Sequence, residues 1–394
     1  MSLVSQSTAV IVMNLRSLPR RFWMSAAMVF ASAVVVAILL AFLAMAKGFE
    51  TTMQGAGSDD IAFFLRISSG AELNSSVSNE QVNLLRNAPG IATNDNGPII
   101  SPELYVIVDG LKKTSQTKAN IPLRGLNQQG IALRENFKLV EGRMFATGTN
   151  ELIVGQGILN QFDGFELGAE IRSGKNRWTV VGIFTTGGNV FESELWADAK
   201  VIQNLYNRGS SYQSVRAKLT APDQIEAIKA YIENDPRLNQ DVQSEQSYFS
   251  EQGKGLSYMA LFGRVISTVM ALGALAGALN TMYTSVSDRA GEIATLRAIG
   301  FSHFSAFVGT LVEALVLSVI GGLLGSVAAF VFFDGLSAAT LGGSFTQVVF
   351  EFKLTSDLFV QGATMALIIG FISGFFPAWR AARVPVIVAF QSGR

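Results

Sequence analysis

The chain contains no cysteine and one histidine, His303, among its 394 residues. The lack of cysteine excludes disulfide bonds, thiolate nucleophiles and cysteine-ligated metal sites, and one histidine cannot form a site that needs two imidazoles. Charged residues make up only 15% of the chain, below the ~25% of a typical soluble protein. Because the net charge is zero, no overall basic field indicates nucleic-acid binding.

Hydrophobic residues reach 49% of the chain and gather in four long uncharged runs: Phe22–Ala46, Val265–Val286, Ala314–Phe333 and Leu358–Trp379. About 20 apolar residues in a helix cover the ~30 Å hydrocarbon core of a bilayer, so each run is long enough to cross a membrane. The stretch between the first two runs has the composition of a water-soluble domain. The sequence therefore predicts an integral membrane α-helical protein with four transmembrane helices and a large α+β extracytoplasmic domain inserted between helices 1 and 2.

The distribution of arginine predicts the orientation. Cytoplasmic segments favour Lys and Arg, and arginines precede the first run, occupy the link between the second and third, and follow the fourth: Arg16, Arg20, Arg21, Arg289, Arg297, Arg380, Arg383 and Arg394. The link between the third and fourth runs instead carries Asp334, Glu351 and Asp357 against Lys353. Both termini are therefore predicted to be cytoplasmic and the insert to be outside.

A cleaved signal peptide is the alternative for the first run, because Ala44–Ala46 resembles a signal-peptidase site. The apolar region of a signal peptide is ~7–15 residues long, whereas Phe22–Ala46 is much longer, so an uncleaved anchor is favoured. The predicted segments are then, in order, a cytoplasmic N-terminal segment 1–21, transmembrane helix 22–47, extracytoplasmic domain 48–255, transmembrane helix 256–286, cytoplasmic helix 287–301, transmembrane helix 304–333, extracytoplasmic link 334–357, transmembrane helix 358–379 and cytoplasmic tail 380–394.

The insert contains the same local pattern twice. Strand Ile61–Ile67, helix Ser78–Asn87 and strand Leu104–Val108 form a first β-α-β unit, in which Ser78 can cap the helix. Strand Ser214–Leu219, a helix carrying Ile225, Ile228 and Ile232, and strand Val242–Phe249 form a second. Together they predict a split, ferredoxin-like α+β subdomain, residues 58–115 and 212–250. Residues 116–211, with short strands, a hairpin at Gly174–Asn176 and a helix Ala197–Tyr206, predict an inserted β-rich subdomain.

Catalytic signatures are missing from the sequence. No G-x-x-x-x-G-K-[ST] phosphate loop and no H-E-x-x-H motif occurs. The neighbouring acids Asp59 with Asp60, and Glu192 with Glu194, are of the kind that usually lies solvated on a surface. The sequence therefore predicts no enzymatic activity for this chain.

The link Ser287–Gly300 carries the strongest local signal outside the spans. Ser287 or Asp288 can cap a helix, Ile293 and Leu296 recur at helical spacing, and Gly300 suits a C-terminal stop. A short amphipathic helix between two spans can dock in the groove of a partner or lie in the membrane interface. The residues alone favour neither.

Several residues in the spans predict helix packing or pairing. Small residues four apart allow close helix approach in lipid, and such pairs are Gly273 with Gly277, Gly321 with Gly325, and Gly370 with Gly374. Glu313 is predicted to pair with a nearby arginine such as Arg297 or Arg380 and to serve transmission and stability. Arg264 is predicted to extend toward lipid headgroups, and His303 to be a polar interface residue.

Three motifs and the segment layout carry a family resemblance. The run D-R-A-G-E-I-A-T-L-R-A-I-G-F at 288–301, the pair Glu313–Ala314 with Gly321–Gly325, and the tail Gly374–Pro385 resemble the ABC-transporter permease family that includes MacB, FtsX and the LolC/LolE lipoprotein exporters. The layout of one span, an ectodomain and three spans is also similar. The resemblance covers the whole chain.

The resemblance implies a dimeric permease of the bacterial inner membrane, formed with a second copy or a paralogue and driven by a cytoplasmic ABC ATPase that binds ATP and Mg. Residues 287–301 would be the coupling helix that meets the ATPase, with Asp288, Arg289, Glu292, Ile293, Leu296, Arg297 and Gly300 as its contact set. The insert would match the porter and sabre subdomains of the family, and a periplasmic adaptor would be a further partner.

About twenty residues precede the first span, whereas MacB carries a fused ATPase, so the ATPase is expected to be a separate polypeptide that supplies the hydrolysis. The expected function is mechanotransmission: ATP hydrolysis moves the extracytoplasmic domain, and a substrate is exported or extracted from the outer side of the inner membrane. Two alternatives remain, a non-transporting FtsX-like regulator of an extracytoplasmic enzyme and a membrane-anchored enzyme. The resemblance does not name a substrate.

Overall fold

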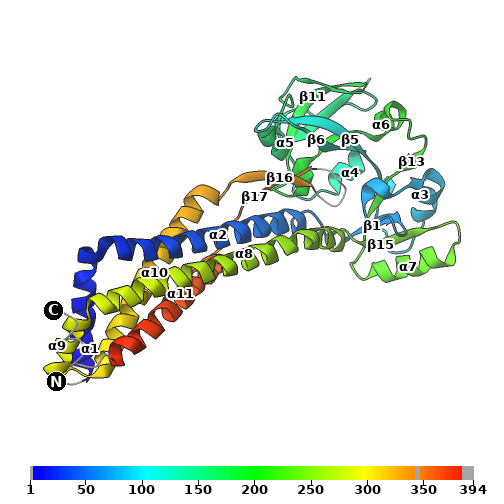
Figure 1. Cartoon of the computed structure of the whole chain (residues 1–394). Helices are drawn as coiled ribbons and strands as arrows, with labels where there is room; N and C mark the ends of the chain where they lie inside the picture. The colour runs from blue at the N-terminus through cyan, green and yellow to red at the C-terminus, as the bar shows by residue number, and fades with distance from the viewer. Residues whose placement is uncertain (1–2, 175, 342–346, 384–394) are drawn as a thin grey trace. The chain divides into compact units, whose positions relative to one another are not determined.

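The computed structural model describes residues 3–174, 176–341 and 347–383, and Figure 1 labels its elements. The chain separates into two compact units. One, here called the helical unit, consists of residues up to Lys47, Tyr258–Leu336 and residues from Phe352 onward. The other, the inserted domain, consists of Gly48–Ser257 and Ser337–Glu351.

Four helical segments are long and apolar enough to cross a membrane, as predicted: Leu3–Gln54, Ala260–Asp288, His303–Phe333 and Ser356–Arg383. They correspond to α1 (Leu3–Ser17), η1 (Leu18–Arg21) and α2 (Phe22–Gln54), then α8 (Glu245–Asp288), α10 (His303–Phe333) and α11 (Ser356–Arg383). The sequence analysis did not foresee helix α1. It ends beside Pro19, which cannot donate a backbone hydrogen bond. The predicted tail from residue 384 lies outside the described residues.

Two of the predicted glycine pairs lie where helices touch. A Cβ built on Gly321 would lie 2.5 Å from the carbonyl oxygen of Val29 in α2, and one on Gly325 2.3 Å from that of Ala33. Gly370 and Gly374 of α11 approach α10 in the same way. A side chain at these four positions would hold the helices apart. Gly273 and Gly277 of α8 differ, because a Cβ on either would meet no atom within 4 Å.

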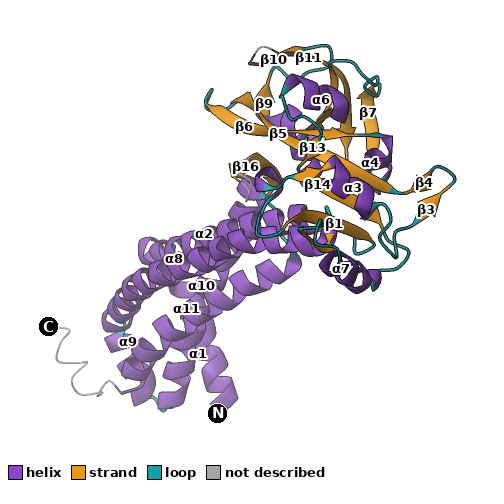
Figure 2. Cartoon of the chain, turned by 90° about the vertical axis from the view of Figure 1, so that its right-hand side faces the viewer, coloured by secondary structure: helices purple, strands orange, loops and turns teal. Residues whose placement is uncertain are grey.

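The first part of the inserted domain is a four-stranded antiparallel sheet, which can be followed in Figure 2. Its strand order is β5-β14-β1-β15, formed by β1 (Ile61–Arg66), β5 (Ile100–Lys112), β14 (Ser214–Lys218) and β15 (Gln240–Ser244). With α3 (Asn79–Leu85) and α7 (Gln224–Asn234) this is the ferredoxin-like arrangement. The predicted strand Val242–Phe249 is wrong beyond Ser244, because Glu245 begins α8.

The two faces of this sheet bury different side chains, because successive residues of a strand point to opposite sides. Phe64 of β1 and Val215 of β14 share an apolar core with Val82 of α3 and Ile228 of α7. On the other face, the guanidinium of Arg216 lies 4.4 Å from the ring centroid of Phe63. The second face is therefore buried without being apolar.

The second part of the inserted domain joins the same sheet through β5. Strand β5 pairs with β14 through Ile100–Glu103 and with β6 through Leu104–Leu111, so the two parts share one strand and the predicted strand Leu104–Val108 is too short. The main elements of this second part are β6 (Lys118–Leu126), α4 (Gln128–Ala132), β7 (Lys138–Gly142), β8 (Glu151–Gly155), α5 (Gln156–Gln161), β9 (Phe162–Asp163), β10 (Glu170–Ser173), β11 (Asn176–Thr185), η3 (Val190–Ser193), β12 (Leu195–Asp198) and α6 (Ala199–Leu205).

The prediction that residues 334–357 form only an extracytoplasmic link is wrong. It contains two strands, β16 (Ser337–Leu341) and β17 (Gln347–Glu351), which pair antiparallel and belong to the inserted domain. The backbone N–H of Val349 donates to Ser193 Oγ at 2.8 Å, and Val349 joins the core of the β-rich part. The inserted domain is therefore built from two separate stretches of the chain.

Candidate functional site

The link between α8 and α10 forms a short helix, α9 (Ala290–Ala298). The predicted caps Ser287 and Asp288 are wrong, because both belong to the end of α8 and Arg289 occupies the N-cap position without a side-chain cap bond. Only Arg289 separates the two helices. The start of α9 is thus determined by the junction with α8 and by what Arg289 contacts.

The C-terminal stop at Gly300 is confirmed. Gly300 has φ +100°, which non-glycine residues rarely adopt. Its N–H donates to Arg297 O at 3.1 Å, and the N–H of Phe301 donates to Leu296 O at 3.0 Å. These two bonds form the Schellman motif, which satisfies carbonyls that the helix end leaves free.

Arg289 is the central side chain of this region and is buried. Its Nη1 donates to Glu313 Oε2 of α10 at 3.0 Å, its Nη2 to Asn14 Oδ1 of α1, and its Nε to Glu292 Oε2 at 3.3 Å. One guanidinium therefore ties the start of α9 to two other helices.

Glu313 pairs with a nearby arginine, as predicted, but that arginine is Arg289 and neither of the two named examples. Arg297 instead approaches His303 Nε2 at 3.2 Å, and the guanidinium of Arg380 lies 5.7 Å from the ring centroid of Tyr283. His303 also contacts Ala382 O at 2.6 Å, so it is a polar contact between α10 and α11. Arg289 replaces the predicted arginines because the α8–α9 junction directs it inward, whereas Arg297 lies at the far end of α9.

The predicted contact residues of α9 face different ways. Ile293 is 7% exposed and packs with Val286 and Ala381, while Leu296 and Arg297 are half-buried. Glu292 and Thr295 are exposed, and Ile299 is 69% exposed. The apolar face predicted for a partner is therefore turned inward, and Ile299, which the sequence analysis missed, is on the open side with Glu292 and Thr295. The spacing of three and four residues between Glu292, Thr295 and Ile299 was the sequence signal that could have placed them on one face of the helix.

Arg264, predicted to extend toward headgroups, is exposed on α8. Asp288 and Gly300 are also exposed. The structure thus brings Arg289, Glu292 and Glu313 together and leaves Arg264 outside that cluster.

The inserted domain contains a second polar cluster, which the sequence analysis missed. Seven charged side chains, each from a different element or loop of the domain, are buried together: Glu72, Glu103, Arg124, Arg134, Glu194, Arg216 and Glu245. We call this set the buried charge network. Three of its members, Glu103, Arg124 and Arg216, lie on strands, and their local sequence does not distinguish them from the solvent-facing polar residues of a half-buried strand.

Arg124 and Arg216 organise the network. Arg124 donates to Glu194 at 2.6 and 2.7 Å and to Glu72 at 2.7 and 2.8 Å. Arg216 donates to Glu103 Oε2 at 2.6 Å and to Glu245 Oε1 at 2.6 Å. Because Glu245 is the first residue of α8, the network holds the start of that helix to the sheet.

The pKa values of Glu103 and Glu245 are shifted in opposite directions. Burial alone would raise the pKa of Glu103, but Arg134, Arg216 and Arg124 outweigh it and hold the pKa at about 2. Burial raises the pKa of Glu245, and its single arginine partner does not offset that rise. Four carboxylates share three guanidiniums, so Glu245 is the acid that the network compensates least.

The described residues were also compared with the requirements of a metal site and of a catalytic acid pair. No group of three or more His, Asp or Glu side chains among them could hold a metal ion. The acid pairs considered from the sequence have structural roles: Asp60 pairs with Lys218 at 2.5 Å, and Glu192 accepts from the backbone of Thr186 and Gly188 at 2.8 Å.

Four helices that are long and apolar enough to cross a membrane, with a large α/β domain inserted after the first, place the chain in the class of multi-pass membrane proteins. Comparison with known families specifies it further. A model described as the MacB-like periplasmic core domain matches residues 25–235, and one described as the FtsX-like permease C-terminal domain matches residues 264–386. The chain therefore belongs to the MacB/FtsX-like family of ABC-transporter permeases, which are multi-pass proteins of the inner membrane.

Individual relatives agree with this family. The macrolide export ATP-binding/permease protein MacB 1/2 of Paracoccus denitrificans is 25% identical over 70% of this chain and 43% of its own length. MacB of Neisseria meningitidis serogroup A is 26% identical over 75% of this chain and 48% of its own. The chain thus spans less than half the length of these relatives. The periplasmic region of MacB from Actinobacillus actinomycetemcomitans aligns with a TM-score of 0.36 at 15% identity, over 50% of this chain and 92% of that one.

Proposed function

We propose that this chain is the permease subunit of an ABC transporter and that it converts ATP hydrolysis on a separate ATPase subunit into motion of the inserted domain. One observation carries the proposal. Helix α8 runs without a break from Glu245, held in the buried charge network, to Asp288, next to α9. A force applied at α9 would reach the inserted domain through one continuous helix.

The ATPase would contact the open side of α9. Glu292, Thr295 and Ile299 form an exposed face, and the contacts of Arg289 with Glu313 and Asn14 keep α9 from moving independently of α1 and α10. ATP and Mg would bind to the ATPase, because this sequence contains no G-x-x-x-x-G-K-[ST] phosphate loop.

The arginine distribution supports cytoplasmic termini and an inserted domain outside the membrane. A second permease copy would pair through α8, where a Cβ built on Gly273 or Gly277 would meet no neighbouring helix among the described residues within 4 Å, so that another helix could approach. The transported class would be a substrate exported or extracted from the outer side of the inner membrane, with a periplasmic adaptor as a further partner. The names of two relatives mention the export of macrolides and of pyoverdine. These substrates are assigned to the relatives and not to this chain.

The test is ATPase stimulation in nanodiscs by the full chain and a candidate ABC ATPase. The double variant Thr295→Arg with Ile299→Asp should abolish both association and stimulated hydrolysis, because it changes the open face of α9 and leaves the contacts of Arg289 intact. Ile67→Asp is the matched control, since Ile67 is 55% exposed in the inserted domain and should leave both unchanged. Wild-type stimulation by the α9 variant would disprove the docking face, and the lack of any ATPase partner would disprove the permease role.

A further inference from the structure

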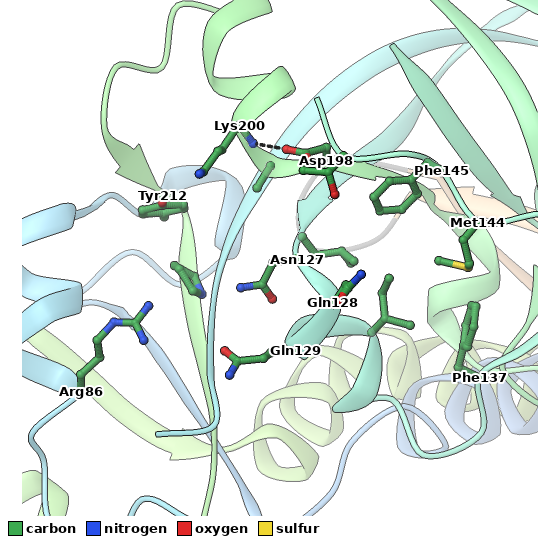
Figure 3. A pocket seen from close by; sticks show the side chains of 15 residues that line it. Arg86, Asn127, Gln128, Gln129, Phe137, Met144, Phe145, Asp198, Lys200 and Tyr212 are labelled. Atoms are coloured by element: carbon green, nitrogen blue, oxygen red, sulfur yellow. Dashed lines mark hydrogen bonds between the residues drawn. The ribbon is translucent and has the colours of Figure 1, made fainter. Parts of the chain in front are cut away.

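A cavity of about 670 Å³ opens on the inserted domain where its two parts meet (Figure 3). This volume lies within the ~300–1,000 Å³ of small-molecule sites. The main lining side chains are Arg86, Lys200, Asn127, Gln129, Phe137 and Phe145. Tyr212 at its margin packs against the cores of both parts, so the cavity lies over the junction of the domain.

One end of the cavity carries two positive charges. Arg86 and Lys200 line it, and neither side chain forms a hydrogen bond or an ion pair with another residue that the structure describes. Asp198 also lines the cavity, but its carboxylate accepts from the backbone N–H groups of Lys200 at 2.7 Å and Gly148 at 3.1 Å. These backbone N–H groups hold the carboxylate in place without cancelling its charge, so the two cations leave the lining with a net positive charge.

The opposite wall is apolar and held in place. Figure 3 shows Phe137, Met144 and Phe145 together on the side away from Arg86. The ring of Phe137 stacks on buried Trp196 at a centroid distance of 5.6 Å. The loop that carries Met144 and Phe145 is held by the bidentate pair of Arg143 with Glu151 at 2.6 and 2.7 Å. This wall is therefore formed before any ligand arrives.

Amide side chains lie between the two ends. Asn127 Oδ1 accepts from Gly130 N at 2.8 Å, which leaves its Nδ2 as a donor. The side-chain amides of Gln128 and Gln129 make no hydrogen bond to the described residues. Three side-chain donors can therefore satisfy polar atoms in the middle of a ligand.

We propose that this cavity binds a small amphipathic organic anion. Its carboxylate or sulfonate would pair with Arg86 and Lys200, and its apolar ring system would contact Phe137, Met144 and Phe145. The amides of Asn127, Gln128 and Gln129 would orient the molecule between these ends. The assignment does not depend on ATPase coupling, because every lining residue belongs to the inserted domain.

The test is calorimetric titration of the full chain in nanodiscs with naphthalene-2-carboxylate, and with naphthalene-2-carboxamide as its uncharged counterpart. Empty nanodiscs correct for partition into lipid. The carboxylate should bind saturably and at least tenfold more tightly than the amide, and its binding should weaken with added salt. Arg86→Gln with Lys200→Gln should lower carboxylate affinity at least tenfold and leave the amide unchanged.

The matched control is Arg172→Gln with Arg177→Gln, which removes two exposed charges from the β10–β11 hairpin outside the cavity. It should leave carboxylate binding unchanged. The proposal would be overturned by a lack of saturable carboxylate binding, by equal affinity for carboxylate and amide, or by unchanged affinity in the Arg86/Lys200 variant. Thermal unfolding of each variant verifies that the inserted domain is intact.

Discussion

Arg216 Nε donates to Glu245 Oε1 at 2.6 Å, and this contact joins strand β14 to the first residue of α8. Both side chains are buried. A buried ion pair does not by itself stabilise a fold, because desolvation offsets the attraction, but removal of one partner leaves an uncompensated charge. The members of the network should therefore differ in their response to neutralisation.

Glu103→Gln should destabilise the inserted domain far more than Glu245→Gln. Glu103 accepts from all three arginines of the network, so its loss should lower the free energy of unfolding by about 3–5 kcal/mol. Glu245 has one arginine partner and a pKa raised by burial, so an uncharged acceptor there should cost about 1 kcal/mol. Denaturant unfolding followed by tryptophan fluorescence reports both values, since Trp178 and Trp196 lie in this domain.

Glu226→Gln is the control for that pair, because Glu226 is largely exposed and a surface charge contributes little. Equal losses for the Glu103 and Glu245 variants would show that the arginines do not distinguish the two acids.

Acid should weaken the inserted domain in a defined window. The folded pKa of Glu103, about 2, lies below its ordinary 4.5, and that of Glu72 is also lowered. Their stabilisation is complete above about pH 4.5 and is lost as the pH falls toward 2. Glu245 acts oppositely, because its raised pKa makes the folded state take up a proton first. Unfolding free energies between about pH 7 and pH 3 should show a shallower acid loss in Glu103→Gln than in the wild type.

Much of the architecture could be predicted because its signals are local. A span requires only an uninterrupted apolar run, and the β-α-β units follow from alternation and from the cap at Ser78, whose hydroxyl accepts from Gln81 N as expected. Gly300 could be predicted for the same reason, since a helix stop requires one residue with positive φ.

The rest depends on contacts between distant residues. Strand β5 serves two parts of the sheet, and the paired strands β16 and β17 join a domain whose first stretch ends about 80 residues earlier in the chain. The link between Glu72 and Arg216 crosses 144 positions. Composition cannot distinguish a buried Arg216 from an exposed one. The choice of Arg289 over Arg297 as the partner of Glu313 likewise depends on the α8–α9 junction, which no periodicity encodes.

Arg289 and Glu313 should be energetically coupled. Arg289→Gln or Glu313→Gln alone should lower stability in detergent by about 3–5 kcal/mol, because the first leaves buried Glu313 without its ion-pair partner and the second leaves buried Arg289 with only the exposed Glu292. The double variant should be less destabilised than the sum of the two, with a coupling energy of about 1–3 kcal/mol. Thermal unfolding of the four proteins completes the cycle, and strict additivity would show that the contact has no energetic role.

Gly321→Ala and Gly273→Ala should have different effects although both are glycines of predicted small-residue pairs. The new methyl group at position 321 would lie 2.5 Å from a backbone oxygen of α2, whereas at 273 it would meet nothing within 4 Å. Overpacking should cost Gly321→Ala about 1–3 kcal/mol, and Gly273→Ala should retain wild-type monomer stability. Weaker self-association of Gly273→Ala, measured by crosslinking in nanodiscs, would support dimer formation through α8; unchanged self-association would count against it.

Alanine substitution at Gly291 and at Gly300 should change the stability of α9 in opposite directions. Gly291 lies within α9, is exposed and has open space around it, so Gly291→Ala should stabilise the helix by about 1 kcal/mol. Gly300 has φ +100°, so Gly300→Ala should cost about 1–3 kcal/mol and loosen the last turn. Hydrogen exchange of the α9 amides measures both effects, with slower exchange expected in the first variant and faster exchange in the second. If α9 transmits force, ATPase stimulation should fall only in Gly300→Ala; equal stimulation despite a loosened helix end would show that coupling does not require an ordered α9.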